Sequence, residues 1–96
     1  PHPPYASPQE FSNLYDPATM AIPEKPVKSL LGHTLTAEDW RKLKIRYYGS
    51  CSWIDSCIGS LLEVVGPNTI VVFTSDHGDI LGEHGYFSKG LFCYEG

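Results

Sequence analysis

Residues 69–89 read TIVVFTSDHGDILGEHGYFSK, and this stretch sets the requirements for the rest of the 96-residue chain. Residues 69–74 are β-branched, aromatic and almost continuously apolar, which is typical of a strand buried on both faces of an α/β sheet. Asp76 and His77 follow directly, at the carboxyl end of the expected strand, where open α/β sheets place their binding sites. The stretch therefore predicts one half of a metal site, with the other ligands expected from outside this chain.

Asp76 and His77 suit a divalent metal because Asp offers a hard oxygen and neutral His a borderline nitrogen. Zn²⁺ and Mn²⁺ fit this pair, and Ca²⁺ fits if further carboxylates complete the site. The alternative is an Asp that caps a turn beside a surface His. The buried strand expected before the pair, and the glycines after it, favour the metal site.

The loop after the pair carries four further polar candidates. Lys89 would present a positive charge to an anionic substrate if the chain brings it back near a metal, although a loop Lys on its own is normally solvated. His84 is expected to be structural, and Asp79 and Glu83 are expected to cap turns.

His2 lies in the sequence PHPPY, where flanking prolines restrict the backbone and can aim the imidazole with little loss of entropy. By position alone it would be an exposed histidine near the end of the chain. The proline-rich residues 1–26 are expected to be extended and to dock on a larger body, and residues 27–35 to be a linker.

A long helix is predicted over residues 37–65. Thr36 can cap its start, and Gly66 and Pro67 end it. Apolar residues recur at steps of three and four and form one continuous stripe: Trp40, Leu43, Tyr47, Cys51, Ile54, Ile58, Leu61, Leu62 and Val65. Gly49 and Gly59 either weaken this helix or allow another element to approach closely.

The composition, with 42% hydrophobic and 19% charged residues, is that of a folded protein. A net charge of −4 without a basic cluster argues against a nucleic-acid partner, and no apolar run is long enough to span a membrane. Three cysteines, an odd number with no CxxC pair, are expected to be small buried residues rather than a disulfide framework.

Four motifs in order resemble the sulfatase family of the alkaline-phosphatase superfamily. TIVVFTSDHGDILGEHGYFSKG resembles the C-terminal metal segment of that family, and PHPPY its substrate-loop histidine motif. FSNLYDP and the prolines after it resemble the family's linker, and residues 35–78 its long helix leading into the metal strand. The resemblance covers nearly the whole chain and implies a partial α/β catalytic domain: an extended substrate loop and linker (1–35), a long helix (36–66), and a metal-binding strand and loop (68–96).

The resemblance also implies a role for each matching residue. Asp76 and His77 match two metal ligands, in an Asp-His variant of a motif that is Asp-Asn in many sulfatases. Lys89 and His2 match catalytic contacts to the ester oxygens and the leaving group, and Tyr94-Glu95 resembles a structural pair. The metal implied is Ca²⁺ first, with Mn²⁺, Zn²⁺ or Mg²⁺ as alternatives.

The family's nucleophile, a Cys in a CxPSR-like motif that is oxidised to formylglycine, is not present in these 96 residues. The expected function is therefore part of a metal-dependent sulfatase acting on a small-molecule or glycan sulfate ester, and the chain alone should be inactive. A phosphonate or phosphate mono- or diester hydrolase of the same superfamily is one alternative. A non-catalytic metal-binding fragment is the other.

Overall fold

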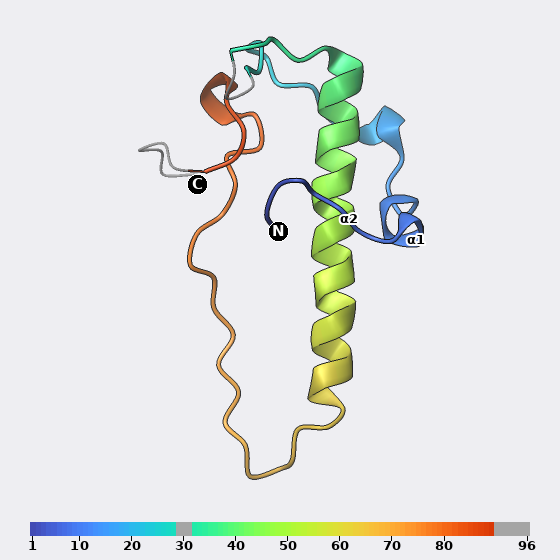
Figure 1. Ribbon diagram of the computed structural model, residues 1–96, viewed down its shortest axis with the longest axis vertical. Helices are drawn as coiled ribbons and strands as arrows, with labels where there is room; N and C mark the ends of the chain where they lie inside the picture. Colours follow the sequence, from blue (N-terminus) through green and yellow to red (C-terminus); the bar gives the residue numbers. More distant parts are fainter. Residues whose placement is uncertain (29–31, 90–96) are drawn as a thin grey trace.

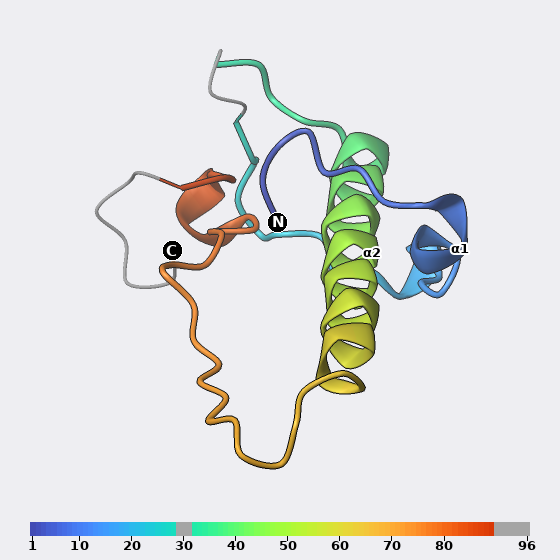
Figure 2. The ribbon, with the colours of Figure 1, turned by 60° about the horizontal axis from the view of Figure 1, so that its bottom comes forward.

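A single long helix dominates the computed structural model, which describes residues 1–28 and 32–89 (Figure 1). Its elements are α1 (Gln9–Ser12), the 3₁₀ turn η1 (Pro17–Thr19), α2 (Ala37–Leu62) and the 3₁₀ turn η2 (Glu83–Gly85). Figures 1 and 2 show α1 and η1 on one side of α2, and the loop that carries η2 on the other. No helix in residues 1–28 and 32–89 is both long and apolar enough to cross a membrane.

The predicted long helix is confirmed as α2, which ends three residues before the predicted end. Thr36 and Asp39 form a reciprocal capping box: the Thr36 hydroxyl accepts from the Asp39 N–H at 3.1 Å, and the Asp39 carboxylate accepts from the Thr36 N–H at 3.3 Å. Glu38 and Lys42 form an i,i+4 ion pair at 2.6 Å on the exposed face.

Trp40 lies at the centre of a small packed region at the N-terminal end of α2. The residue is only 1% exposed, and its indole N–H donates to the Ala21 carbonyl at 3.1 Å. Gly82 approaches the Trp40 ring so closely that an added Cβ would lie 2.8 Å from its carbons. Because Gly82 also has φ of +99°, both space and backbone conformation require glycine there. The other buried apolar residues in the described parts of the chain are Tyr5, Val27 and Ile80.

α1 packs against the middle of α2 at a second contact. A Cβ on Gly49 would lie 2.7 Å from the Ser12 hydroxyl oxygen, so the glycine allows the two helices to meet, as one of the two sequence alternatives proposed. The Tyr15 and Ser52 hydroxyls are hydrogen-bonded at 2.6 Å nearby. These contacts fix the N-terminal arm along the first half of the helix.

The strand predicted over residues 69–74 is not formed, and that prediction is wrong for this structure. The segment is extended but solvent-exposed: Ile70 is 90%, Val72 80% and Phe73 82% exposed. The physical reason is that a strand needs a neighbour for its backbone groups, and the described parts of the chain contain only isolated bridges, from Lys28 to Thr34 and to Tyr86. The described residues are therefore helix and loop rather than α/β.

The cysteines differ in part from expectation. Cys51 and Cys57 are free thiols, as the lack of a disulfide pattern predicted. Cys51 is half-buried, whereas Cys57 is exposed on the second half of α2, so the buried position expected for it is wrong in this structure. Cys93 and the Tyr94-Glu95 pair lie outside the described residues.

Candidate functional site

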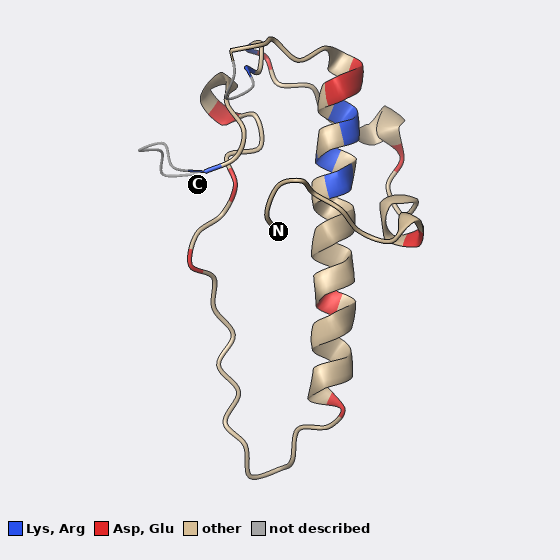
Figure 3. Cartoon of the chain, viewed as in Figure 1, with Lys and Arg blue, Asp and Glu red and all other residues tan. Residues whose placement is uncertain are grey.

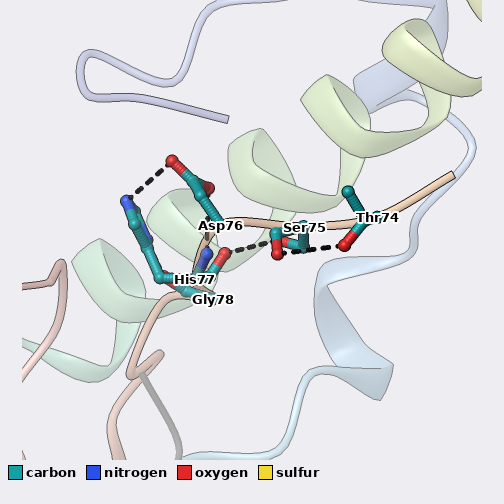
Figure 4. A network of polar contacts seen from close by, with 5 residues as sticks. All are labelled: Thr74, Ser75, Asp76, His77 and Gly78. Atoms are coloured by element: carbon teal, nitrogen blue, oxygen red, sulfur yellow. Dashed lines mark hydrogen bonds and ion pairs between the residues drawn. The ribbon is translucent and has the colours of Figure 1, made fainter.

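Asp76 and His77 lie side by side just after the exposed apolar segment (Figure 4). The Asp76 Oδ2 and His77 Nε2 atoms are 3.5 Å apart, and the His77 backbone N–H donates to Asp76 Oδ1 at 2.9 Å. The Asp76 side chain is 87% and the His77 side chain 39% exposed. Both groups are thus accessible and turned towards each other.

The His77 ring is oriented by the backbone after it. Its Nδ1 lies 2.9 Å from the Gly78 carbonyl oxygen, and the Ser75 hydroxyl donates to the His77 carbonyl at 2.7 Å (Figure 4). A carbonyl oxygen only accepts, so a proton on Nδ1 satisfies this contact and leaves the Nε2 lone pair facing Asp76. A backbone carbonyl holding the second ring nitrogen is the arrangement usual for metal-binding histidines.

The Asp76 carboxyl is held in its ionised form. The hydrogen bond from the His77 N–H lowers the pKa of Asp76 below its ordinary value, and the positive charge of Lys89 has a smaller effect in the same direction. An ionised carboxylate and an imidazole lone pair 3.5 Å apart can both reach one cation at bond lengths of about 2.0–2.6 Å. The donor pair therefore fits a divalent metal, without completing a site.

The rest of a metal site is not found in the part of the chain that the structure describes. Within residues 1–28 and 32–89, no group of three or more His, Cys, Asp or Glu side chains could hold an ion. Any metal held by Asp76 and His77 would need ligands supplied by other residues.

Lys89 and His2 are both exposed and lie on separate segments. Lys89 is close enough to Asp76 to affect its pKa. The His2 Nδ1 lies 2.6 Å from the Pro3 carbonyl oxygen, and the His2 side chain borders a small hollow beside Trp53 and Ile54 of α2. Among the described residues, no hydrogen bond or ion pair joins His2 to Asp76, His77 or Lys89.

Asp79 organises the loop that ends at Lys89. Its Oδ1 accepts from the backbone N–H groups of Leu81, at 3.1 Å, and Ser88, at 3.0 Å, so the turn-capping role predicted for Asp79 is confirmed. Its Oδ2 accepts a hydrogen bond from the hydroxyl of Tyr5.

Two other loop residues lie in the short turn η2. Glu83 begins the short turn η2, and His84 has a left-handed backbone with φ of 53°.

The positive charge of α2 is confined to its first half (Figure 3): Arg41, Lys42, Lys44 and Arg46. A cavity of about 370 Å³ lies at this end of the helix, between the segment that carries His2 and the loop that carries Lys89. Pro3, Tyr5 and Phe87 line it together with Lys42 and Arg46. The two segments that carry the predicted catalytic residues therefore border a common space.

The model of the sulfatase family matches residues 1–96, the entire chain. The chain belongs to the sulfatase family. A choline-sulfatase of Rhizobium meliloti is 29% identical over 117 aligned positions that cover all of this sulfatase chain and 23% of the relative. The iduronate 2-sulfatase of Mus musculus is 32% identical over 93% of the chain and 22% of the relative. An arylsulfatase of Clostridium perfringens is 44% identical over 58% of the chain and 12% of the relative.

The sulfatase chain spans less than a quarter of the length of these relatives. No solved structure matches it. The exposed apolar segment and the Asp76–His77 pair both occur in a chain that matches only part of each relative.

Sequence reasoning missed Tyr5, which lies in the proline-rich segment 1–26 that was expected to dock on a larger body. Tyr5 is 7% exposed, its ring meets Tyr47 edge-on at 5.2 Å, and its hydroxyl reaches Asp79. General chemistry predicts that a buried tyrosine hydroxyl forms a hydrogen bond with a polar partner. Nothing in the sequence pattern identified that partner, since it lies 74 residues away.

Proposed function

We propose that this chain forms one wall of the active site of a metal-dependent sulfatase, in which Asp76 and His77 supply two of the metal ligands. The observation that carries the proposal is the Asp76–His77 pair: two donor atoms 3.5 Å apart, with His77 oriented by the Gly78 carbonyl, in a chain that matches the sulfatase family throughout. These residues would contribute to the C-terminal metal segment of the catalytic domain, in the Asp-His form of its motif.

Sulfatases generally use a metal ion and a formylglycine. Ca²⁺ is the metal we propose first, because the resemblance to sulfatases implies it and because carboxylates from outside this chain would supply the further oxygen ligands that Ca²⁺ needs. A bound divalent ion would polarise the ester oxygens and lower the pKa of a coordinated hydroxyl. The nucleophile would come from outside residues 1–96, because none of Cys51, Cys57 and Cys93 lies in a CxPSR-like motif.

The other predicted site residues would act on the substrate. The Lys89 ammonium would offset the negative charge that builds on the ester oxygens during attack. The His2 imidazole would donate a proton to the leaving oxygen as a general acid. Because Lys89 already lowers the pKa of Asp76, its charge acts at the metal end of the site.

The incomplete fold is part of the same proposal. Residues 69–74 would become a buried strand, and the domain an α/β domain, once the remaining strands of the sheet pair with this segment. The second half of the α2 stripe would pack on that sheet; Ile54, Leu61 and Leu62 are 42%, 63% and 49% exposed in this chain. The divisions at 1–35, 36–66 and 68–96 would then be three parts of one catalytic domain.

The substrate class we propose is a sulfate ester. The names of the three relatives refer to an aryl group, to choline and to iduronate, so what they share is the sulfate ester rather than one leaving group. A small-molecule or glycan sulfate ester therefore suits this chain, and the leaving group is left to residues that differ among these proteins.

The test is the substitution Asp76→Ala in the intact protein that contains these residues. Hydrolysis of 4-nitrophenyl sulfate should fall by more than about 100-fold, because even groups that only orient metal ligands contribute about 10- to 100-fold. Asp55→Ala, which removes an exposed carboxylate on α2, is the matched control and should retain activity. Undiminished hydrolysis by Asp76→Ala would refute the ligand assignment.

Two further outcomes decide between substrate classes and between catalytic and silent chains. Faster hydrolysis of 4-nitrophenyl phosphate or a phenylphosphonate ester than of the sulfate would contradict the sulfate-ester class. The 96-residue chain alone should show no turnover, and turnover by it would contradict a nucleophile outside residues 1–96.

A further inference from the structure

The hydrogen bond between Tyr5 and Asp79 joins the two segments that carry the proposed substrate contacts. Tyr5 is three residues after His2, and Asp79 lies in the loop that ends at Lys89. The two partners are 74 residues apart in sequence. Among the described residues, this is the side-chain hydrogen bond that links the His2 segment to the Lys89 loop.

Asp79 connects Tyr5 to the loop because its two carboxylate oxygens accept hydrogen bonds from different segments. Oδ2 accepts from the Tyr5 hydroxyl, while Oδ1 accepts from the backbone of Leu81 and of Ser88. Ser88 is 6% exposed, immediately precedes Lys89, and accepts from the Ile80 N–H through its carbonyl at 3.1 Å. One carboxylate thus holds the start and the end of the loop and the N-terminal segment together.

Tyr5 is itself held rigidly. The residue is 7% exposed, and its ring packs edge-on against Tyr47 of α2, with ring centroids 5.2 Å apart and an interplanar angle of 90°. Burial and the hydrogen bond to Asp79 both raise the pKa of Tyr5 above its ordinary value, so the hydroxyl keeps its proton and remains a donor to the carboxylate. The long rigid helix α2 therefore forms the base on which the contact is built.

We propose that Tyr5 and Asp79 are positioning residues, which set His2 and Lys89 on opposite sides of one substrate through the hydrogen bond between them. This inference rests on the proposed function, because it takes from that proposal the roles of His2 and Lys89. Tyr5 and Asp79 need not touch substrate or metal. Their effect is on the geometry of two groups that must act together in the transition state.

The substitution Tyr5→Phe tests the positioning role in the intact protein because it removes only the hydroxyl and keeps the ring against Tyr47. We expect kcat for 4-nitrophenyl sulfate to fall about 10- to 100-fold with KM changed little, since misplaced catalytic groups affect mainly the transition state. Bound metal per chain should be unchanged. Asp79→Asn should also lower kcat, because it replaces the accepting Oδ2 by an amide N–H and so weakens and reverses the hydrogen bond without deleting it. The double variant should be no slower than the slower single variant, since both substitutions act on one contact.

The matched control is Tyr15→Phe. Tyr15 also contacts α2 through its hydroxyl, at 2.6 Å from Ser52, but it lies away from the loop that carries Lys89. This variant should lose stability similar to that of Tyr5→Phe and keep the wild-type kcat. If Tyr5→Phe keeps the wild-type kcat, or loses no more activity than Tyr15→Phe, the positioning role is overturned.

His2→Ala and Lys89→Ala separate this inference from the proposed function. If these variants lose activity and Tyr5→Phe does not, only the positioning role fails. If either retains full activity, the proposed function fails for that residue and the positioning role fails with it. Loss of bound metal in Tyr5→Phe would also overturn the inference, because it would show that the hydroxyl acts on the metal pair instead.

Discussion

The two ends of this molecule differ sharply in how well they are packed. At one end, the first half of α2, the N-terminal arm and the loop 79–89 bury Trp40 and Ile80 to 1% exposure. At the other, the second half of α2 and residues 69–74 expose almost all of their apolar side chains, with Ile70 at 90%. Figure 1 shows the N-terminal arm and the loop that carries η2 beside the first half of α2, and Figure 3 shows the Lys and Arg residues of α2 on that same half.

The difference indicates which interactions the described residues make among themselves, and the proposed function assigns the others to parts of the domain outside this chain. At the packed end, polar groups find partners within the chain. The Trp40 indole N–H donates to the Ala21 carbonyl, and the Asp79 carboxylate accepts from backbone N–H groups of its own loop. At the other end, which we call the bare end, residues 69–74 have the apolar composition of a buried strand but are exposed to solvent like a loop. Asp76 and His77 closely follow residues 69–74 and share their exposure.

The largest expected effect comes from charging the bare segment in the intact protein. Val72→Lys should lower the free energy of unfolding by several kcal/mol, because it would bury a charge at a site where removing a side chain alone costs about 2–5 kcal/mol. Val64→Lys is the matched control: Val64 and Val72 are 81% and 80% exposed in this chain, but Val64 lies outside both the predicted strand and the α2 stripe. It should change stability by no more than about 0.5 kcal/mol.

Thermal unfolding of the two intact variants measures this contrast. If Val72→Lys and Val64→Lys have similar midpoints, residues 69–74 stay exposed to solvent in the intact protein and do not enter a sheet. If only Val72→Lys unfolds early or fails to accumulate as soluble protein, the segment is buried by the rest of the domain.

A smaller effect is expected from pH at the packed end. The pKa of Tyr5 is raised by burial first and by Asp79 second, so folding favours its neutral form. Below the ordinary tyrosine pKa of about 10, Tyr5 is neutral in both states and its contribution is intact. As pH rises above about 10, the unfolded chain ionises Tyr5 and the folded chain does not, so stability falls, by at most about 1.4 kcal/mol per pH unit from this group.

The thermal midpoint of the wild type and of Tyr5→Phe between pH 8 and 11 checks this sign. The wild type should lose more stability above pH 10 than the variant, and absorbance at 295 nm should show Tyr5 remaining neutral in that range. Equal losses in the two proteins would show that Tyr5 ionises freely and that its contact with Asp79 is weak.

The sequence predicted local features better than distant ones, for physical reasons. The start of α2 was predictable because Thr36 and Asp39 cap it within one turn. The turn role of Asp79 was predictable because its backbone partners are two and nine residues away. The strand over residues 69–74 was not formed because strand formation depends on partners that the described chain does not supply. The Tyr5–Asp79 contact depends on the fold and has no signature in spacing.

The metal content of the intact protein gives the most direct test of whether Asp76 and His77 form half of a metal site. Protein purified with Ca²⁺ and then freed of excess should retain about one metal ion per chain in the wild type and in the control Asp55→Ala. Asp76→Ala and His77→Ala should each retain much less, while their α2 helicity stays at the wild-type level. Equal metal content in all four proteins would contradict a metal-ligand role for the pair and, with it, the proposed active-site wall.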